Sequence, residues 1–175
     1  MIADYQELSQ RTSQWPRGSD GYRGEQHRRY AAMSLAGEAG EVVDALKKHL
    51  AGQPLDRDKV RLELGDVAWS IAAVCEVQDL NFATVMTPKI VCGLDVFKVA
   101  LQLSRRATFC ASIVYDGRVA TIDLVHLCEV FLALVGLLDF TLEEVLTANL
   151  AKLATRYPLG IFREEDSIAR RDVAR

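Results

Sequence analysis

The chain has 175 residues and a formal net charge of −3, and 50% of its residues are hydrophobic. This length suits one domain, or two small halves in close contact, with a core of useful size. The weakly acidic balance gives no general electrostatic attraction to nucleic acid or to a membrane surface, so we expect neither as a partner.

Helical spacing of apolar residues predicts a series of helices joined by short turns. In chain order they cover residues 3–12, 25–50, 57–79, 88–112, 120–138 and 141–156, with a turn or one-turn helix at 81–86. Gly52 and Pro54 are suited to end the second helix, and Asp56 is suited to cap the third. Thr141 and Glu144 have the spacing of a capping box at the start of the last helix.

The segments between and after these helices have the composition of loops. Residues 13–24 hold Pro16 and three glycines, and residues 115–118 carry a plain turn sequence. Residues 163–175 are mostly charged, so we expect a polar tail that is solvated or frayed. No segment alternates between polar and apolar residues. The predicted fold is an all-α antiparallel bundle of about five main helices, with residues 1–162 as a single domain.

A faint internal repeat at an offset of 60 residues relates the two halves of the chain. It places Asp123 and His126 where Glu63 and Asp66 stand. The repeat would make the fold two pseudo-repeated helical hairpins in one chain. Identity between the copies is slight, and two amphipathic hairpins can also resemble each other by chance.

Two pairs of carboxylates lie on the first two long predicted helices. Glu38 and Glu41 are three residues apart, as are Glu63 and Asp66, so each pair shares one helix face. A short connection makes the helices antiparallel neighbours, and opposed pairs would bring four carboxylates into one cleft. A divalent cation would relieve their repulsion, and oxygen ligands favour Mg²⁺ or Mn²⁺. The alternative is two solvated faces that form salt bridges with nearby basic residues: Lys47, Lys48 or Arg61.

Small residues surround the acidic pairs. Gly37, Ala39 and Gly40 lie around the first pair, and Gly65 lies within the second. Glycine costs about 1 kcal/mol inside a helix relative to alanine, so its presence suggests close helix approach or room for a ligand. Trp69 follows the second pair and is expected to point away from it, into the core.

Aromatic and basic residues precede the first acidic pair. The aromatic group could stack on a nucleobase, although packing or loop anchoring is the commoner role; it consists of Trp15, His27 and Tyr30. The basic group is either a solvated face or an attraction for an anionic substrate; it consists of Arg23, Arg28 and Arg29.

Three segments carry a resemblance to a known family. LAGEAGEVVDALKK and ELGDVAW contain an ExxE…ExxD signature, and ANLAKLATRYPLGIF has an RYPxGxF ending. Together they resemble the MazG-like nucleoside triphosphate pyrophosphohydrolases. The resemblance implies an all-α fold and Mg²⁺-dependent hydrolysis between the α and β phosphates, which gives a nucleoside monophosphate and pyrophosphate.

The same resemblance implies roles for individual residues. The implied metal ligands are Glu38, Glu41, Glu63 and Asp66. The implied catalytic residues are Glu41, Glu38 and Glu63, and the sequence does not rank them as the base that accepts the proton of the attacking water. Three polar residues share one face of the closing helix and could reach phosphates: Asn149, Lys152 and Arg156. Their alternative role is an exposed helix side.

Residues 87–140 are an insertion relative to short members of that family, and we expect them to form a helical hairpin. This hairpin could replace the one that a second subunit supplies elsewhere, so the protein is either a homodimer or a pseudo-dimeric single chain. Lys98 and Leu101 stand where the first acidic pair would recur. One active site per bundle is therefore expected.

Other functions remain open from the sequence. The chain could be a metal- or nucleotide-binding module, or a protein-interaction module, without turnover. It could also be a relative that acts on phosphoribosyl-ATP. The intact carboxylates favour catalysis, because a scaffold has no need for such local repulsion.

The cysteines and the N-terminus predict a location. The four cysteines lack the spacing of a zinc or redox motif, so we expect buried free thiols in a reducing cytoplasm. The polar start MIADYQELSQ is unlike a signal peptide, and no apolar run reaches the roughly 20 residues needed to span a bilayer.

Overall fold

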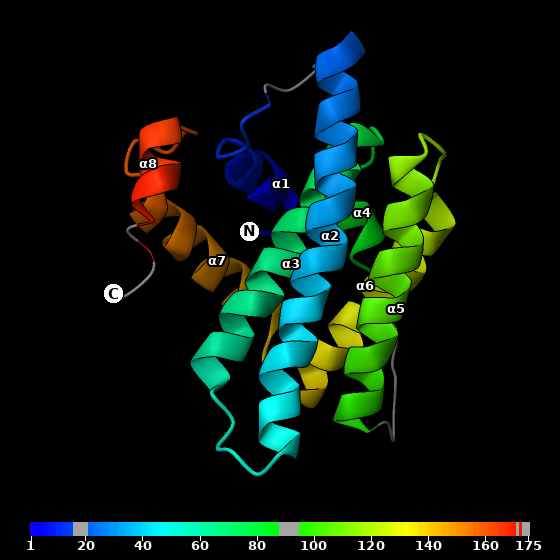
Figure 1. Ribbon diagram of the computed structural model, residues 1–175, viewed down its shortest axis with the longest axis vertical. Coiled ribbons are helices and arrows are strands. Elements are labelled where there is room, and N and C mark those ends of the chain that lie inside the picture. The colour runs from blue at the N-terminus through cyan, green and yellow to red at the C-terminus, as the bar shows by residue number, and fades with distance from the viewer. Residues whose placement is uncertain (16–20, 88–94, 171, 173–175) are drawn as a thin grey trace.

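The computed structural model describes residues 1–15, 21–87, 95–170 and 172 (Figure 1). The helices are α1 (Ile2–Gln10), α2 (Gly21–Leu50), α3 (Arg57–Val77), α4 (Phe82–Val85), α5 (Val96–Tyr115), α6 (Thr121–Leu137), α7 (Leu142–Arg156) and α8 (Glu164–Ala169). These ranges contain no strand, so the predicted all-α class is confirmed. Five helices have 15 residues or more, namely α2, α3, α5, α6 and α7.

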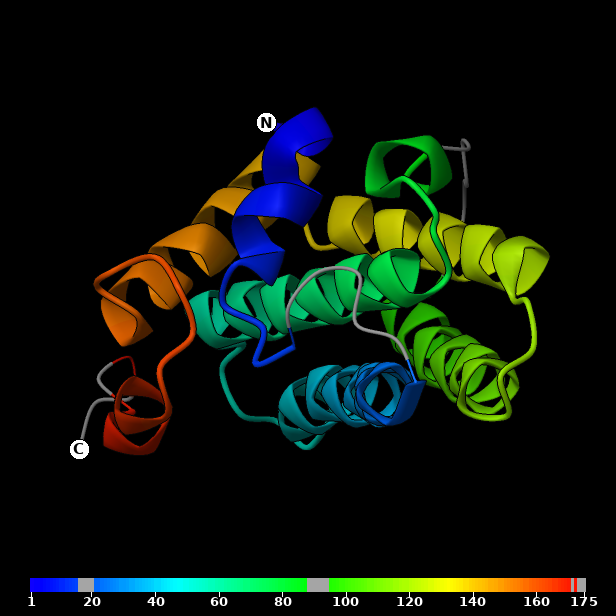
Figure 2. The same cartoon turned by 90° about the horizontal axis from the view of Figure 1, so that it is seen from above.

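Four of the long helices form a bundle from two antiparallel hairpins. α2 packs against both α3 and α5, and α5 packs against α6 (Figure 2). α1 and α7 contact α3 on the side away from α2. α3 therefore lies between α2 and α7, and side chains from these three helices can meet in one place.

Local sequence explains where several helices begin. The Asp56 side chain accepts a hydrogen bond from the Lys59 backbone N–H at 3.0 Å, as expected of an N-cap. Both halves of the capping box between Thr141 and Glu144 are present. Gly52 follows α2 with a φ of +92°, a conformation that glycine adopts without strain. These predicted boundaries are confirmed.

The end of α5 differs from the prediction, because the helix continues to Tyr115. The Arg28 side chain donates hydrogen bonds to the carbonyls of Val114 at 3.3 Å and Tyr115 at 2.9 Å. The Arg28 side chain thereby gives the Tyr115 carbonyl a partner at the helix end, and it adds to the Gly117 N–H that also donates to the Val114 carbonyl. Arg28 thus fastens α2 to α5. The predicted continuous helix from residue 88 is wrong at Asp95, an extended N-cap after which α5 begins; residues 88–94 lie outside the described residues.

The turns after α3 and α6 support the internal repeat. Asp79 and Asp139, which are 60 positions apart, both have positive φ, 52° and 55°. The Leu80 N–H donates to the Cys75 carbonyl at 2.8 Å, and the Phe140 N–H donates to the carbonyl five residues before it at 3.0 Å. A capping residue follows each turn, but α4 has 4 residues and α7 has 15. The two halves share a turn and diverge in the helix that follows.

A single hydrophobic cluster joins the helices of the bundle. Cys75, Cys110 and Cys128 are buried in it as free thiols, and burial raises the pKa of each. The prediction of buried free thiols is confirmed for these three. The fourth, Cys92, lies outside the described residues.

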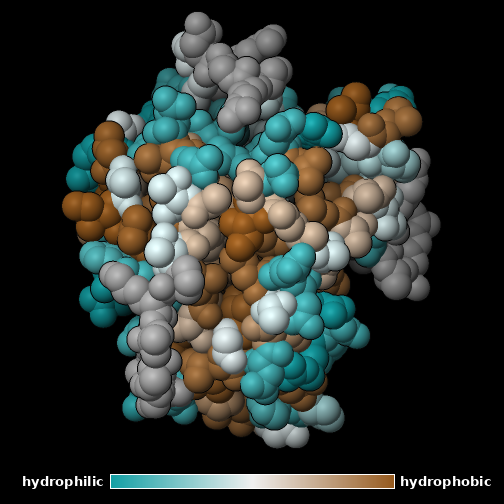
Figure 3. Space-filling model, turned by 180° about the vertical axis from the view of Figure 1, so that it is seen from behind, coloured by the Kyte–Doolittle hydropathy of each residue, from teal (hydrophilic) through white to brown (hydrophobic). Residues whose placement is uncertain are grey.

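The rear face of the molecule carries an apolar area. On the face behind the view of Figure 1, hydrophobic side chains gather in the middle of the surface, with hydrophilic side chains around them (Figure 3). No single described helix is long and apolar enough to cross a membrane. α6 and α7, which meet at a bend of 96°, have together the length and apolar composition of a broken membrane span. The predicted polar tail contains the helix α8, so it is not frayed there, whereas the exposed Glu164 and Glu165 agree with a solvated segment.

Candidate functional site

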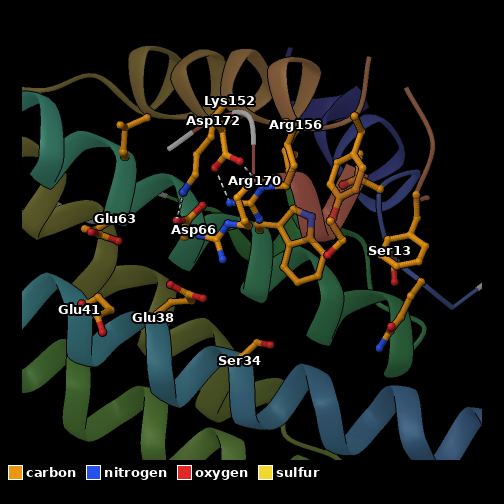
Figure 4. A pocket seen from close by; sticks show the side chains of 18 of the residues that line it. Ser13, Ser34, Glu38, Glu41, Glu63, Asp66, Lys152, Arg156, Arg170 and Asp172 are labelled. Atoms are coloured by element: carbon orange, nitrogen blue, oxygen red, sulfur yellow. Dashed lines mark hydrogen bonds and ion pairs between the residues drawn. The ribbon is translucent and has the colours of Figure 1, made fainter. Parts of the chain in front are cut away.

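A cleft opens where α2, α3 and α7 meet, with α8 at one side (Figure 4). Its volume is about 1100 Å³. The acidic residues Glu38, Glu41, Glu63 and Asp66 all line it, as do Lys152 and Arg156 of α7. Two helices of the hairpin therefore present acids across the cleft from cations on a third helix.

Three of the four predicted acids form a compact cluster. Glu38 of α2 and Glu63 and Asp66 of α3 each offer one carboxylate oxygen, and these oxygens lie within 4.8 Å of one another. The spacing of three residues puts the two α3 acids on one face, and the antiparallel packing brings Glu38 opposite them. Glu41 lines the same cleft but is exposed and lies outside this cluster.

The cluster holds more negative charge than its surroundings neutralise. Burial, followed by the charge of Asp66, raises the pKa of Glu38 from 4.5 to about 7, although Lys152 opposes the rise. Burial and Asp66 also raise the pKa of Glu63. Oxygen donors at this spacing, with raised proton affinity, fit a hard divalent cation such as Mg²⁺ or Mn²⁺. The residues present are therefore suited to the metal that the sequence predicts.

The three clustered acids do not form the salt bridges of the alternative interpretation, which paired them with Lys47, Lys48 or Arg61. Lys47 and Lys48 pair with Asp44 rather than with the cluster. Arg61 pairs with Asp58 at 2.8 Å. The cation that contacts the cluster is Lys152 of α7, which pairs with Asp66 and is mostly buried.

Asn149 supports the cluster rather than lining the cleft. It is fully buried, and its amide nitrogen donates to an Asp66 carboxylate oxygen at 3.1 Å. Its amide oxygen accepts a hydrogen bond of 2.7 Å from the Tyr5 hydroxyl. Burial, and then the charge of Asp66, raises the pKa of Tyr5, so its hydroxyl stays protonated and can donate. Asn149 thus orients Asp66.

The glycines near the acids have different environments. A Cβ on Gly65 would lie 2.8 Å from the Cβ of Asn149, so this glycine allows α3 and α7 to approach closely. A Cβ on Gly37 or Gly40 would meet nothing within 4 Å. The glycine on α3 therefore permits close helix approach, and the glycines on α2 leave open space, which are the two reasons expected from the sequence.

The aromatic residues lie differently from one another. Trp15 stacks on His27 with ring centroids 5.4 Å apart and contacts Tyr30 at 4.6 Å. This mutual packing favours loop anchoring, although Tyr30 also lines the cleft. Trp69 packs against the core, as predicted, but it also lines the cleft, and its indole N–H donates to the Ser9 carbonyl at 3.2 Å.

The predicted basic group does not gather at the cleft. Arg28 binds carbonyls at the end of α5, and Arg29 pairs with Glu25 on its own helix. The side chain of Arg23 lies outside the described residues. Arg28 and Arg29 therefore give no support to the expected attraction of an anionic substrate to the cleft.

Two residues of the cleft were missed by the sequence reading. Asp172 pairs with Arg156, and Arg170 lines the cleft close to it. Figure 4 shows both between α7 and Asp66. Their chain segment carries mixed charges without helical periodicity, so nothing in the sequence pointed to a contact across 16 residues.

Comparisons with known proteins agree with this geometry. Residues 26–90 match the family model of the MazG nucleotide pyrophosphohydrolase domain. This part of the chain is therefore similar to the MazG domain. It includes the four predicted acids Glu38, Glu41, Glu63 and Asp66, whereas the match ends before the polar residues of α7.

A phage protein is similar to part of the chain. The "Gene 37 protein" of Mycobacterium phage L5 is 38% identical over 61 residues, which cover 32% of this chain and 54% of the relative. The chain thus spans about half the length of this relative. No solved structure matches the chain.

Proposed function

We propose that the chain is a Mg²⁺-dependent nucleoside triphosphate pyrophosphohydrolase, which cleaves between the α and β phosphates. One observation carries the proposal: three carboxylates from two helices of the part similar to a MazG domain face Lys152 and Arg156 across one cleft. Acids that suit a metal and cations that suit phosphate are the two requirements of phosphoryl transfer.

The acids divide into ligands and a base in this proposal. Glu38, Glu63 and Asp66 would hold Mg²⁺, or Mn²⁺, because their oxygens lie together. When bound, the ion would neutralise phosphate oxygens and lower the pKa of the attacking water. Glu41 lies at the same cleft but outside the cluster, so we assign it the role of base.

The reaction then follows from the chain's own side chains. The water oxygen attacks the α-phosphorus, and the bond from that phosphorus to the oxygen bridging to the β-phosphorus breaks. Glu41 accepts the water proton and passes it to solvent, while pyrophosphate leaves. Lys152 and Arg156 bind the phosphates, and Asn149 keeps Asp66 oriented.

A panel of nucleotides tests the activity. Ribo- and deoxyribonucleoside triphosphates and phosphoribosyl-ATP are incubated with the protein and Mg²⁺, and pyrophosphate and phosphate are measured separately. In H₂¹⁸O the label should appear in the monophosphate, because the water attacks the α-phosphorus. If metal binds but no compound releases pyrophosphate, the chain is a binding module without turnover.

Two variants separate the base from the ligands. Glu41→Gln should lose most turnover but keep the rise in melting temperature that Mg²⁺ causes, whereas Glu63→Gln should lose both. Glu25→Gln is the matched control, because Glu25 is on α2 but does not line the cleft. Activity retained in Glu41→Gln would remove Glu41 from the mechanism.

The assembly follows from the position of the inserted hairpin. α5 packs directly on α2, so we propose that the α5–α6 hairpin does within one chain what a second subunit would do. The alternative is a homodimer, which would cover the apolar area of the rear face (Figure 3). Sedimentation velocity distinguishes them, since the pseudo-dimeric chain is expected at the mass of one chain.

A further inference from the structure

The segment that follows α7 folds back along the cleft. We call residues 162–170 together with Asp172 the α8 segment. The Phe162 N–H donates to the Arg11 carbonyl at 3.1 Å, and the Phe162 ring contacts Tyr157 at 5.8 Å. α8 itself packs on α7. The segment is thus fastened to α1 and α7 before it reaches the cleft.

The α8 segment ends in a paired acid inside the cleft. Arg170 ends α8 with a left-handed backbone, φ 45° and ψ 48°, and the chain reverses so that Asp172 faces Arg156. A left-handed conformation costs an arginine roughly 1 kcal/mol, so contacts made beyond the turn must hold it. The Asp172 side chain is 1% exposed and that of Arg156 is 19% exposed.

The pair has the geometry with which arginine binds phosphate. The Arg156 Nε donates to one carboxylate oxygen of Asp172 at 2.7 Å, and a terminal nitrogen donates to the other. Two parallel hydrogen bonds of this kind are the common mode of arginine with both carboxylate and phosphate. While Asp172 is bound, this two-donor edge of the Arg156 guanidinium group is not available to a substrate.

We propose that Asp172 occupies the phosphate-binding position of Arg156 and that a polyphosphate must displace it. The inference rests on the proposed function, because it takes Arg156 as a phosphate ligand. Asp172 then sets the affinity of the cleft for its ligand. Arg170 lines the same cleft, and none of the described carboxylates pairs with it, so it adds a cation once Asp172 has left.

A second role for Asp172 would have the opposite effect. Asp172 could instead hold Arg156 in the orientation that a phosphate needs, and its removal would then weaken binding. Displacement predicts tighter binding, because the apparent affinity of a site falls with the fraction of time for which it is blocked. The sign of the change therefore decides between the two roles.

Calorimetric titration with inorganic tripolyphosphate at saturating Mg²⁺ measures this sign. We expect Asp172→Asn to lower the Kd for tripolyphosphate roughly tenfold. This value follows if Asp172 leaves Arg156 free for roughly one-tenth of the time in the wild type. Asp172→Ala should lower the Kd by a similar factor, so that the conclusion does not depend on one variant that could misfold. Glu164→Gln is the matched control, because it removes an exposed acid from α8 that does not line the cleft.

The Arg156→Gln background tests whether the effect passes through Arg156. In that background Asp172→Asn should leave the Kd for tripolyphosphate unchanged, because the two residues act as one unit. Equal or weaker binding by Asp172→Asn, no binding by any variant, or the same tightening in the Arg156→Gln background would each overturn the inference.

The test is separate from that of the proposed function, because tripolyphosphate binding needs no turnover. Tighter binding of tripolyphosphate by Asp172→Asn without hydrolysis of any nucleotide would refute the proposed activity and leave the displacement of Asp172 supported. Hydrolysis with an unchanged or raised KM in Asp172→Asn would support the activity and refute the displacement.

Discussion

Glu38→Gln should stabilise the metal-free protein at alkaline pH. A tenfold change in proton affinity corresponds to about 1.4 kcal/mol. A pKa that rises from 4.5 to about 7 means that the ionised Glu38 costs at most about 3 kcal/mol in the folded state. Solvent in the open cleft screens the charge and lowers this figure to about 1–2 kcal/mol. The neutral amide avoids that cost while keeping the shape of the side chain.

The sign follows from proton linkage. Because the pKa of Glu38 is higher in the folded than in the unfolded chain, the folded state binds the proton more tightly. The free energy of unfolding therefore falls as pH rises from about 4.5, and the loss is complete above about 7. At pH 8 the variant should exceed the wild type by about 1–2 kcal/mol, and at pH 5 the two should differ little.

Urea unfolding followed by circular dichroism in EDTA measures both free energies. Glu25→Gln, at an ion pair elsewhere on the same helix, keeps Glu38, so its free energy of unfolding should show the same fall with pH as that of the wild type. Adding Mg²⁺ should stabilise the wild type more than Glu38→Gln, since the ion relieves the same repulsion. A variant that is less stable than the wild type at pH 8 without metal would refute this account of the cluster.

Three further substitutions test the surroundings of Asp66. Lys152→Ala should lower kcat/KM about 10- to 100-fold without loss of helix in circular dichroism, and an unchanged kcat/KM would mean that Lys152 only neutralises Asp66. Gly65→Ala should lower the free energy of unfolding by about 1–3 kcal/mol in urea, because its Cβ would collide with Asn149; unchanged stability would mean that α3 and α7 can separate freely. Tyr5→Phe should cost about 1 kcal/mol in the same assay by removing the hydrogen bond to Asn149, and a neutral result would assign that bond no net value.

The part of the site that the sequence predicted depends on helical geometry. Glu63 and Asp66 share a face because they are three residues apart, and Glu38 faces them because α2 and α3 form a short-linked hairpin. Spacing within a helix and a short connection are both visible in the sequence, so the cleft acids could be named. The same holds for the capping residues, whose effect is local.

The other residues of the site depend on packing that spacing does not specify. Asn149 and Lys152 were grouped on one face, but the close approach of α7 to Gly65 buries Asn149 against Asp66 and leaves Lys152 at the cleft. Asp172 reaches Arg156 only because the chain reverses at a left-handed residue with no glycine to mark it. Such a contact follows from tertiary structure alone.

Two ion pairs of the cleft each join a proposed ligand-binding group to another side chain. Lys152 neutralises Asp66 and Asp172 neutralises Arg156, so one proposed metal ligand and both proposed phosphate-binding cations are held by other groups. A cation bound by the acids would replace Lys152 at Asp66, and a phosphate would replace Asp172 at Arg156. The first exchange frees Lys152 for the polyphosphate, so metal and nucleotide should each bind more tightly when the other is present. Because this coupling passes through the Lys152–Asp66 pair, Asp172→Asn should leave it unchanged while raising the affinity for polyphosphate alone.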